Sequence, residues 1–225
     1  MKYFDKIITV TENTHNYNGS FSNGEVYSKD LIDLVLTELN KFKSPILLDV
    51  GACTGSYALL DTITNVKIHS FEPSRAYFEL IKNIELNNSK TTCYNVAVSD
   101  YIGKGDFNEV EADSCIALSM LGGIPARHKI VRTVDIDVTT IDYFCKSNKI
   151  TPNVIKIDTE GNELFVLKGA INTIKKHKPV IFAEYSAENV NQYGNGLEQI
   201  NEYFDSVNYE YEILNYGDKI AKTKK

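Results

Sequence analysis

Residues 46–57 (ILLDVGACTGSY) constrain the fold more than any other part of the chain. An apolar run is followed by Gly51 and Gly55, which is the pattern of a buried strand, a glycine-relieved turn and a helix start. Because glycine has no Cβ, the backbone at this turn can approach a ligand closely. A second strand-like run ends in Glu72, whose carboxylate can accept hydrogen bonds from both ribose hydroxyls. The spacing predicts a site for a nucleoside cofactor.

Strand-like and helix-like segments alternate along most of the chain. We expect strands at 46–50, 66–71, 91–98, 154–157 and 180–184, and helices at 26–42, 56–63, 74–87, 140–147, 162–177 and 197–204. Several of these strands are apolar almost throughout, which indicates burial on both faces of a parallel sheet. The pattern predicts a doubly wound α/β fold with a mostly parallel sheet, completed by an antiparallel hairpin of 209–214 with 219–222.

The chain shows no domain boundary, and we expect one domain over residues 1–225. Glycine and proline punctuate residues 99–137, where we expect a hairpin insertion with a loop at 121–128 and a strand at 129–138. The expected parts are an N-terminal cap and helix (1–45), a cofactor-binding half (46–98), the inserted hairpin and loop (99–138) and an acceptor-side half (139–225).

Composition excludes several classes of protein. The net charge of −6 over 225 residues argues against a nucleic-acid partner, because such proteins usually present a basic face. No apolar run approaches the length that a membrane-spanning helix needs, and the N-terminal segment makes a poor signal peptide. The four cysteines form no C-x-x-C pair, so neither a zinc site nor a dithiol motif is indicated. We expect a cytoplasmic protein with reduced thiols.

The first glycine turn discriminates between nucleoside cofactors. Dinucleotide-binding proteins use G-x-G-x-x-G, but here Cys53 stands in place of the second glycine, between Gly51 and Gly55. Such a turn leaves space for an amino-acid moiety, and the Asp49 carboxylate suits an ammonium group and repels phosphate. The residues favour S-adenosylmethionine over a dinucleotide. Alternatively, the two glycines serve only tight packing of the turn.

Polar groups at the end of the third strand lie where the adenine of such a cofactor is expected. Residues 95–99 (NVAVS) end this strand, and the side chains of Asn95 and Ser99 could read the edge of the base. Aromatic stacking by Tyr17, Tyr27 or Tyr57 could cap the cofactor, with packing in the core as the alternative for Tyr27.

Two carboxylates follow the fourth strand and are candidates for the chemistry. Asp158 and Glu160 are two positions apart, so in an extended segment they point to the same side. Together with Glu184 they could act as base and orienting group, or could hold a divalent cation. The alternative is that Glu160 only complements the N-terminus of the next helix. Among the histidines, His128 in the inserted loop is the best candidate for a base, although a solvated loop position is the favoured interpretation.

The glycine turn, taken with residues 155–164 (IKIDTEGNEL) and 166–170 (VLKGA), resembles the FkbM family of S-adenosylmethionine-dependent methyltransferases. The likeness runs from about residue 46 to residue 184, and its most distinctive part is the K-I-D-T-E-G segment. The resemblance implies a Rossmann-like class I methyltransferase fold and methyl transfer to oxygen. It assigns Asp158 and Glu160 to the acceptor side, and Glu184, at the tip of the next strand, could complete this group. The resemblance implies that Asp49, Gly51 and Gly55 line the methionine end, Glu72 holds the ribose, and residues 95–99 hold the adenine. The predicted cofactor-binding residues are Asp49, Gly51, Gly55, Ser56, Tyr57, Glu72, Pro73, Asn95, Ala97 and Ser99.

The resulting hypothesis is an O-methyltransferase that acts on a hydroxyl, with a sugar of a glycan as the expected acceptor. Three alternatives remain: a methyltransferase-like binding domain without activity in a larger glycan-assembly protein, methylation of a small secondary metabolite, and a nucleotide-dependent oxidoreductase. The missing middle glycine disfavours the oxidoreductase.

Overall fold

A computed structural model of the chain describes residues 2–12, 14, 21–22, 25–26, 28–110, 120–121, 130–184, 197–214 and 218–224. Its centre is a seven-stranded sheet in the order β14-β15-β13-β12-β5-β6-β7. The strands are β5 (Ile46–Val50), β6 (Lys67–Phe71), β7 (Thr92–Tyr94), β12 (Val154–Ile157), β13 (Val180–Glu184), β14 (Tyr209–Ile213) and β15 (Asp218–Thr223). The first five are parallel, whereas β14 and β15 are antiparallel, so the predicted doubly wound fold and C-terminal hairpin are confirmed.

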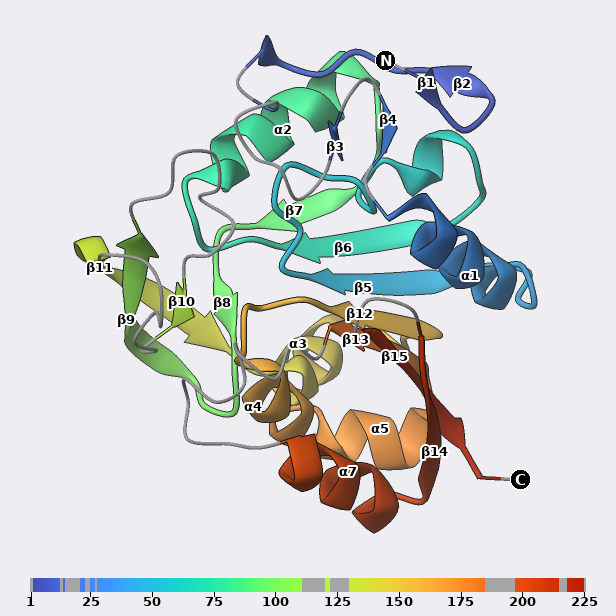
Figure 1. Ribbon diagram of the computed structural model, residues 1–225, viewed down its shortest axis with the longest axis vertical. Coiled ribbons are helices and arrows are strands. Elements are labelled where there is room, and N and C mark those ends of the chain that lie inside the picture. The colour runs from blue at the N-terminus through green and yellow to red at the C-terminus, as the bar shows by residue number, and fades with distance from the viewer. Residues whose placement is uncertain are drawn as a thin grey trace.

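Helices cover both faces of this sheet (Figure 1). They are α1 (Lys29–Leu39), α2 (Ala76–Leu86), α3 (Ile141–Asn148), α4 (Glu163–Lys168), α5 (Ile171–His177) and α7 (Leu197–Ser206). Successive strand residues point to opposite faces, so Leu47 packs in one apolar cluster with α1 and α2, while Leu48 packs in the other with α3, α4, α5 and α7. The apolar strands are therefore buried on both sides, as their composition predicts.

The order of the strands creates a switch point at the centre of the sheet. From β5 the chain steps outward to β6 and β7, and it returns to the other side of β5 with β12 before stepping outward again to β13. In such sheets ligands bind outside the carboxyl ends of the strands at the switch point. Here those ends are Val50 of β5 and Ile157 of β12, which are paired across the sheet.

A second sheet stands beside the ends at which β5 and β6 finish (Figure 1). It has the order β10-β9-β11-β8 and contains β8 (Ala97–Val98), β9 (Gly103–Val110), β10 (Met120–Leu121) and β11 (Ile130–Thr139). Strands β9 and β11 pair antiparallel, which confirms the expected inserted hairpin. Most of the expected loop at 121–128 lies outside the described residues.

The predicted helix over 56–63 is wrong: this segment consists of turns and a short 3₁₀ helix, η2 (Leu60–Thr62). Side-chain hydroxyls donate hydrogen bonds to backbone carbonyl oxygens that would be acceptors within an α-helix. The Tyr3 hydroxyl donates to the Ser56 carbonyl, and the Thr91 hydroxyl donates to the Ala58 carbonyl at 2.6 Å. These partners come from distant parts of the chain, so the local sequence does not reveal them.

Two further elements are divided where we predicted continuity. The expected strand 91–98 is split into β7 and β8, which belong to different sheets, because the chain turns at Asn95 and the Asn95 amide donates to the Glu72 carbonyl at 2.8 Å. The expected helix 162–177 is split into α4 and α5 at Gly169. A Cβ at Gly169 would lie 2.0 Å from the Ser99 carbonyl oxygen, so this break lets two backbone segments approach closely.

The N-terminal residues form short antiparallel pairs, β1 (Lys2–Tyr3) with β2 (Lys6–Ile7) and β3 (Phe21–Ser22) with β4 (Glu25–Val26). The helix expected from residue 26 therefore begins at Lys29. Within the described residues, no helix combines the length and the apolar character that crossing a membrane requires.

Candidate active site

A cavity of about 770 Å³ opens at the switch point of the central sheet. Its walls come from the carboxyl ends of β5, β6, β12 and β13, the first turns of α1, the inserted sheet and the end of β14. The volume lies within the range of small-molecule sites, which is roughly 300–1,000 Å³.

The glycine turn after β5 forms the floor of the cavity. Gly51 has φ +81°, and a Cβ on it would lie 1.7 Å from the carbonyl oxygen of Asp158. The Gly51 and Ala52 N–H groups both donate to the Phe71 carbonyl, each at 3.0 Å. Gly51 is therefore required because β5 meets β12 here. Gly55 does not line the cavity, and a Cβ on it would lie 2.8 Å from Leu80 Cδ1 of α2.

Glu72 lies in the cavity wall at the end of β6 and is almost fully buried. The Cys53 N–H donates to its Oε2 at 2.7 Å, and the Ser74 N–H donates to its Oε1 at 2.9 Å. Burial raises the pKa of this carboxyl, and the hydrogen bonds at Ser74 and Cys53 oppose that shift. Glu72 thus ties the glycine turn to the start of α2, and its oxygens keep lone pairs for further donors. The predicted residues Ser56, Tyr57 and Pro73 also line the cavity.

Asp49 lies away from the cavity wall in a polar row across the sheet. It is fully buried, accepts a hydrogen bond from the Ser70 hydroxyl at 3.0 Å, and pairs in register with Lys156 of β12. Burial raises the pKa of Asp49, and the positive charge of Lys156 opposes that rise. The structure therefore places Asp49 among residues of the sheet and outside the lining of the cavity.

Lys156 lines the cavity, and the sequence reasoning missed it. Its ammonium donates to the Gly51 carbonyl at 2.9 Å and lies 3.4 Å from Asp158 Oδ2. Burial lowers its pKa, but the negative charges of Asp158 and Asp49 more than compensate, so the pKa lies above its usual value. A sequence signal was available, since a single lysine between Ile155 and Ile157 interrupts a strand that is otherwise apolar.

The end of the cavity where the adenine of the cofactor is expected is apolar. Ala97 lines it as predicted, whereas Asn95 and Ser99 do not. The Asn95 amide is turned to the Glu72 and Pro73 carbonyls, and the Ser99 hydroxyl lies 3.4 Å from Asn162 Oδ1. The other lining residues here are Val96, Val98, Phe107 and Leu121. The last two come from the inserted sheet, and nothing in the local sequence indicates which of its side chains face the cavity.

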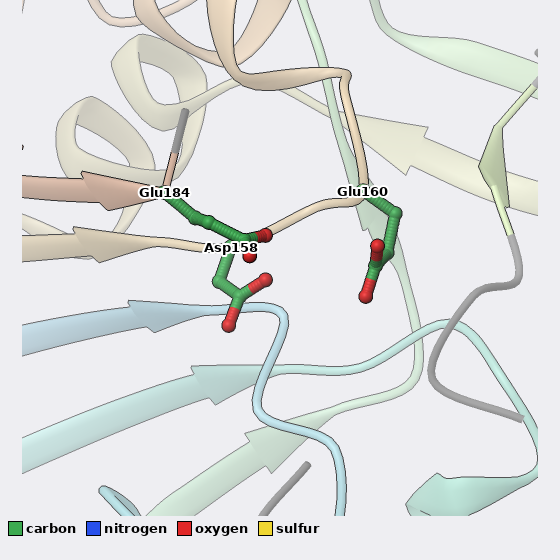
Figure 2. A group of neighbouring side chains, drawn as sticks. All are labelled: Asp158, Glu160 and Glu184. Atoms are coloured by element: carbon green, nitrogen blue, oxygen red, sulfur yellow. The ribbon is translucent and has the colours of Figure 1, made fainter. Parts of the chain in front are cut away.

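The three predicted carboxyl groups converge at the ends of β12 and β13 (Figure 2). Asp158, Glu160 and Glu184 all line the cavity, and one carboxylate oxygen from each lies within 4.8 Å of the others. The segment is not extended as predicted, because Glu160 has φ +56° in a turn. Glu163 stabilises this turn by accepting hydrogen bonds from the Thr159 and Gly161 N–H groups at 2.8 and 3.2 Å. The helix-start role considered for Glu160 is therefore filled by Glu163.

Crowding and burial raise the pKa values of carboxyl groups in and beside this cluster. The negative charge of Asp158, together with burial, raises the pKa of Glu184 to about 10. Burial also raises the pKa of Glu163 to about 7. Like charges at this distance need a proton or a cation to relieve their repulsion. Three convergent carboxylate oxygens are a donor set that suits a hard divalent cation.

Three candidates from the sequence, and one further histidine, remain to be placed. His128, Tyr17 and Tyr27 lie outside the described residues. His69 is buried in β6, and its Nδ1 is hydrogen-bonded to the Tyr94 hydroxyl at 3.1 Å. Burial lowers the pKa of His69 to about 4, so this side chain is a neutral core residue at physiological pH.

Comparison with solved structures places the fold among methyltransferases. A methyltransferase FkbM from Methylobacillus flagellatus superposes with a TM-score of 0.54 at 21% identity, covering 80% of this chain and 43% of that one. A precorrin-6y C5,15-methyltransferase from Geobacter metallireducens superposes with a TM-score of 0.53 at 10% identity, covering 98% and 96%. At these identities the likeness concerns the fold, which is that of the Rossmann-like class I methyltransferases.

Comparison of sequences adds the family. The hexuronic acid methyltransferase AglP of Haloferax volcanii is 29% identical over 157 residues, which are 68% of this chain and 60% of AglP. This chain thus spans less than two thirds of the length of that relative. The methyltransferase FkbM domain model matches residues 49–211, which is well over half of the chain. The chain therefore belongs to the FkbM methyltransferase domain family.

Proposed function

We propose that this protein is an S-adenosylmethionine-dependent O-methyltransferase that acts on a hydroxyl group of a sugar in a glycan. The observation that carries the proposal is a single cavity with Glu72 in one part of its wall and Asp158, Glu160 and Glu184 in another. The first part suits a nucleoside, and the second suits an acceptor hydroxyl. The family membership and the fold agree with methyl transfer.

The lining of the cavity fits the proposed donor. Glu72 offers carboxylate oxygens to ribose hydroxyls, and the apolar wall with Val96 and Phe107 offers a slot for a base. The acidic group near the glycine turn attracts a positively charged sulfonium or ammonium and repels a diphosphate. This charge favours S-adenosylmethionine over NAD.

Methyl transfer needs alignment of the acceptor oxygen with the methyl group, exclusion of water, and removal of the hydroxyl proton. S-adenosylmethionine, when bound, supplies a methyl group on a sulfonium that makes it electrophilic. Asp158 is the proposed base, because its side chain is 40% exposed at the cavity wall and follows directly on β12. Glu184, which carries a proton at neutral pH next to Asp158, and Glu160 orient the acceptor by hydrogen bonds.

A divalent cation is the alternative means of activating the acceptor. Asp158, Glu160 and Glu184 would be its protein ligands, and the cation would lower the pKa of a coordinated hydroxyl. In that case the proton on Glu184 would be displaced by the metal. The two versions use the same carboxyl groups and differ in their response to a chelator.

The acceptor class rests on the family relative. AglP is a hexuronic acid methyltransferase, so a related chain is named for action on a sugar. The three carboxyl groups can accept hydrogen bonds from the several hydroxyls of such a ring. A small secondary metabolite with a hydroxyl group fits the same chemistry and is the competing acceptor.

Two measurements test the proposal. Calorimetric titration should show binding of S-adenosylhomocysteine and no binding of NAD, and the reverse result would refute the donor assignment. A transfer assay with labelled methyl donor over a panel of glycans, glycolipids and hydroxylated metabolites should label a sugar hydroxyl, as read by mass spectrometry.

The base assignment is tested with Asp158→Asn. We expect turnover to fall by about 10² or more while the affinity for S-adenosylhomocysteine changes little. Asp106→Asn is the matched control, because Asp106 is exposed on β9 and does not line the cavity. Equal losses of turnover and donor affinity in Asp158→Asn would remove Asp158 from the role of base.

A further inference from the structure

We propose that Lys156 is the positioning residue for Asp158 and holds the carboxylate of Asp158 in the orientation that accepts the acceptor's proton. This inference rests on the function proposed above and assigns a role to a residue that the motif reasoning left aside. Lys156 acts through Asp158 and does not itself contact the acceptor.

The ammonium of Lys156 has three oxygen neighbours and one aromatic neighbour. It donates to the Gly51 carbonyl at 2.9 Å, lies 3.4 Å from Asp158 Oδ2 and lies 3.7 Å from Asp49 Oδ1. The fourth neighbour is the Tyr57 ring, whose centroid is 5.0 Å from the ammonium. The Gly51 carbonyl accepts the hydrogen bond, and the two carboxylate oxygens add charge attraction from somewhat longer distances.

The strands bring these groups together by register. Lys156 is paired with Asp49 across β12 and β5, so their side chains leave the same face of the sheet. Asp158 follows two residues after Lys156, and its N–H donates to the Val50 carbonyl at 3.0 Å. The close approach of Gly51 to the Asp158 carbonyl then places the end of β12 directly against the glycine turn. Lys156 therefore contacts both the glycine turn after β5 and the proposed general base, Asp158.

The difference in exposure separates the roles of the two charged groups. The side chain of Lys156 is 7% exposed and that of Asp158 is 40% exposed. A molecule in the cavity thus reaches the Asp158 carboxylate, while the ammonium holds Oδ2 from beneath. With Oδ2 held, the Asp158 carboxylate keeps one orientation at the cavity wall, where Glu184 is its hydrogen-bonding neighbour.

The positioning has a physical reason in the crowding of acids. Glu160 and Glu184 stand beside Asp158, and the negative charge of Glu160 would displace the Asp158 carboxylate. A buried fixed cation opposes this displacement strongly, because charges interact more strongly where water is excluded. Displacement of a reacting group by about 1 Å can cost about 10²-fold in rate.

Lys156 also compensates the buried charge of Asp49, and this second role must be separated in the test. Lys156→Met alone would leave Asp49 buried without its cation. The double variant Asp49→Asn/Lys156→Met removes both charges of that pair and leaves Asp158 unchanged. Lys104→Met serves as the matched control, since Lys104 is exposed and, among the residues that the structure describes, forms an ion pair with Asp137 at 2.8 Å.

Three experiments are done on each variant: thermal unfolding, calorimetry for the dissociation constant of S-adenosylhomocysteine, and steady-state kinetics for kcat and KM of methyl transfer. We expect the double variant to stay folded at the assay temperature. The factor by which kcat falls should exceed the factor by which the affinity for S-adenosylhomocysteine falls by at least about tenfold. The KM for the acceptor should change little. Lys104→Met should behave like the wild type.

Several outcomes would overturn the inference. They are a double variant that keeps kcat within about threefold of the wild type, a loss of kcat only in proportion to donor affinity, and a double variant that is unfolded at the assay temperature. The last result would show that the whole fold needs the lysine charge. If the wild type itself transfers no methyl group, the proposed function fails. If the wild type is active and the double variant is equally active, only the role of Lys156 fails.

Discussion

Glu72→Gln is a sensitive test of the donor end of the cavity, because a single side chain there joins two backbone segments. Each carboxylate oxygen of Glu72 accepts one backbone N–H, from Cys53 at 2.7 Å and from Ser74 at 2.9 Å. Glutamine keeps one acceptor oxygen, but its amide nitrogen then faces the other N–H. One hydrogen bond to a charged group is lost, which costs about 1.5–3 kcal/mol at a fully buried site.

For a chain of this size, a loss of about 2 kcal/mol lowers the melting temperature by about 4–8 °C. Affinity for S-adenosylhomocysteine should also fall, by about 1–3 kcal/mol or about 5- to 150-fold, because the carboxylate is the proposed ribose acceptor. Scanning calorimetry and isothermal titration measure the two effects separately. Glu85→Gln is the matched control, since Glu85 is an exposed glutamate on α2. A Glu72→Gln protein with the stability and the donor affinity of the wild type would refute the reasoning.

The remaining predictions concern backbone approach, pH and metal. Gly51→Ala should lower the free energy of unfolding by more than about 3 kcal/mol, because the new Cβ would lie 1.7 Å from a backbone oxygen. Gly103→Ala is the control and should cost about 1–2 kcal/mol, because Gly103 has φ +151° and open space around it. Similar losses for the two variants in denaturant titrations would contradict this reasoning. Burial lowers the pKa of His69 to about 4, so as the pH falls from about 6.5 to about 4 the unfolded chain takes up a proton that the folded chain does not. The free energy of unfolding should therefore decrease as the pH falls through this range. His69→Gln should reduce this pH dependence, and an unchanged pH dependence would argue against a buried neutral histidine. Chelator should abolish methyl transfer, with restoration by magnesium or manganese, if the carboxyl group cluster holds a cation; full activity in chelator would assign the reaction to the metal-free base.

The parallel core was predictable because its signal is local. The expected strands 46–50, 154–157 and 180–184 agree with β5, β12 and β13 at both ends. A run of apolar residues between turn residues is enough to predict a strand that is buried on both faces. Helix and strand breaks were less predictable. At Asn95 and Gly169 the break depends on groups that are distant in sequence or in another sheet, such as the Glu72 and Ser99 carbonyls.

The candidate site was predictable in position and only partly in composition. Glu72 and Asp158 follow directly on β6 and β12, and Glu184 is the last residue of β13; parallel strands bring their carboxyl ends to one edge. Asn95 and Asp49 were expected to reach a ligand, but they are engaged with neighbouring backbone and side chains away from the cavity wall.

The sequence by itself determined the positions of the core parallel strands along the chain, the edge of the sheet that carries the acidic residues, and the family. These depend on residue types and spacings along a continuous piece of chain. Only the tertiary structure decided that Lys156 joins Gly51 to Asp158, and that Phe107 of the inserted sheet lines the cavity. Such contacts depend on strand register and on close packing between distant segments, and hydrophobic periodicity carries no information about either.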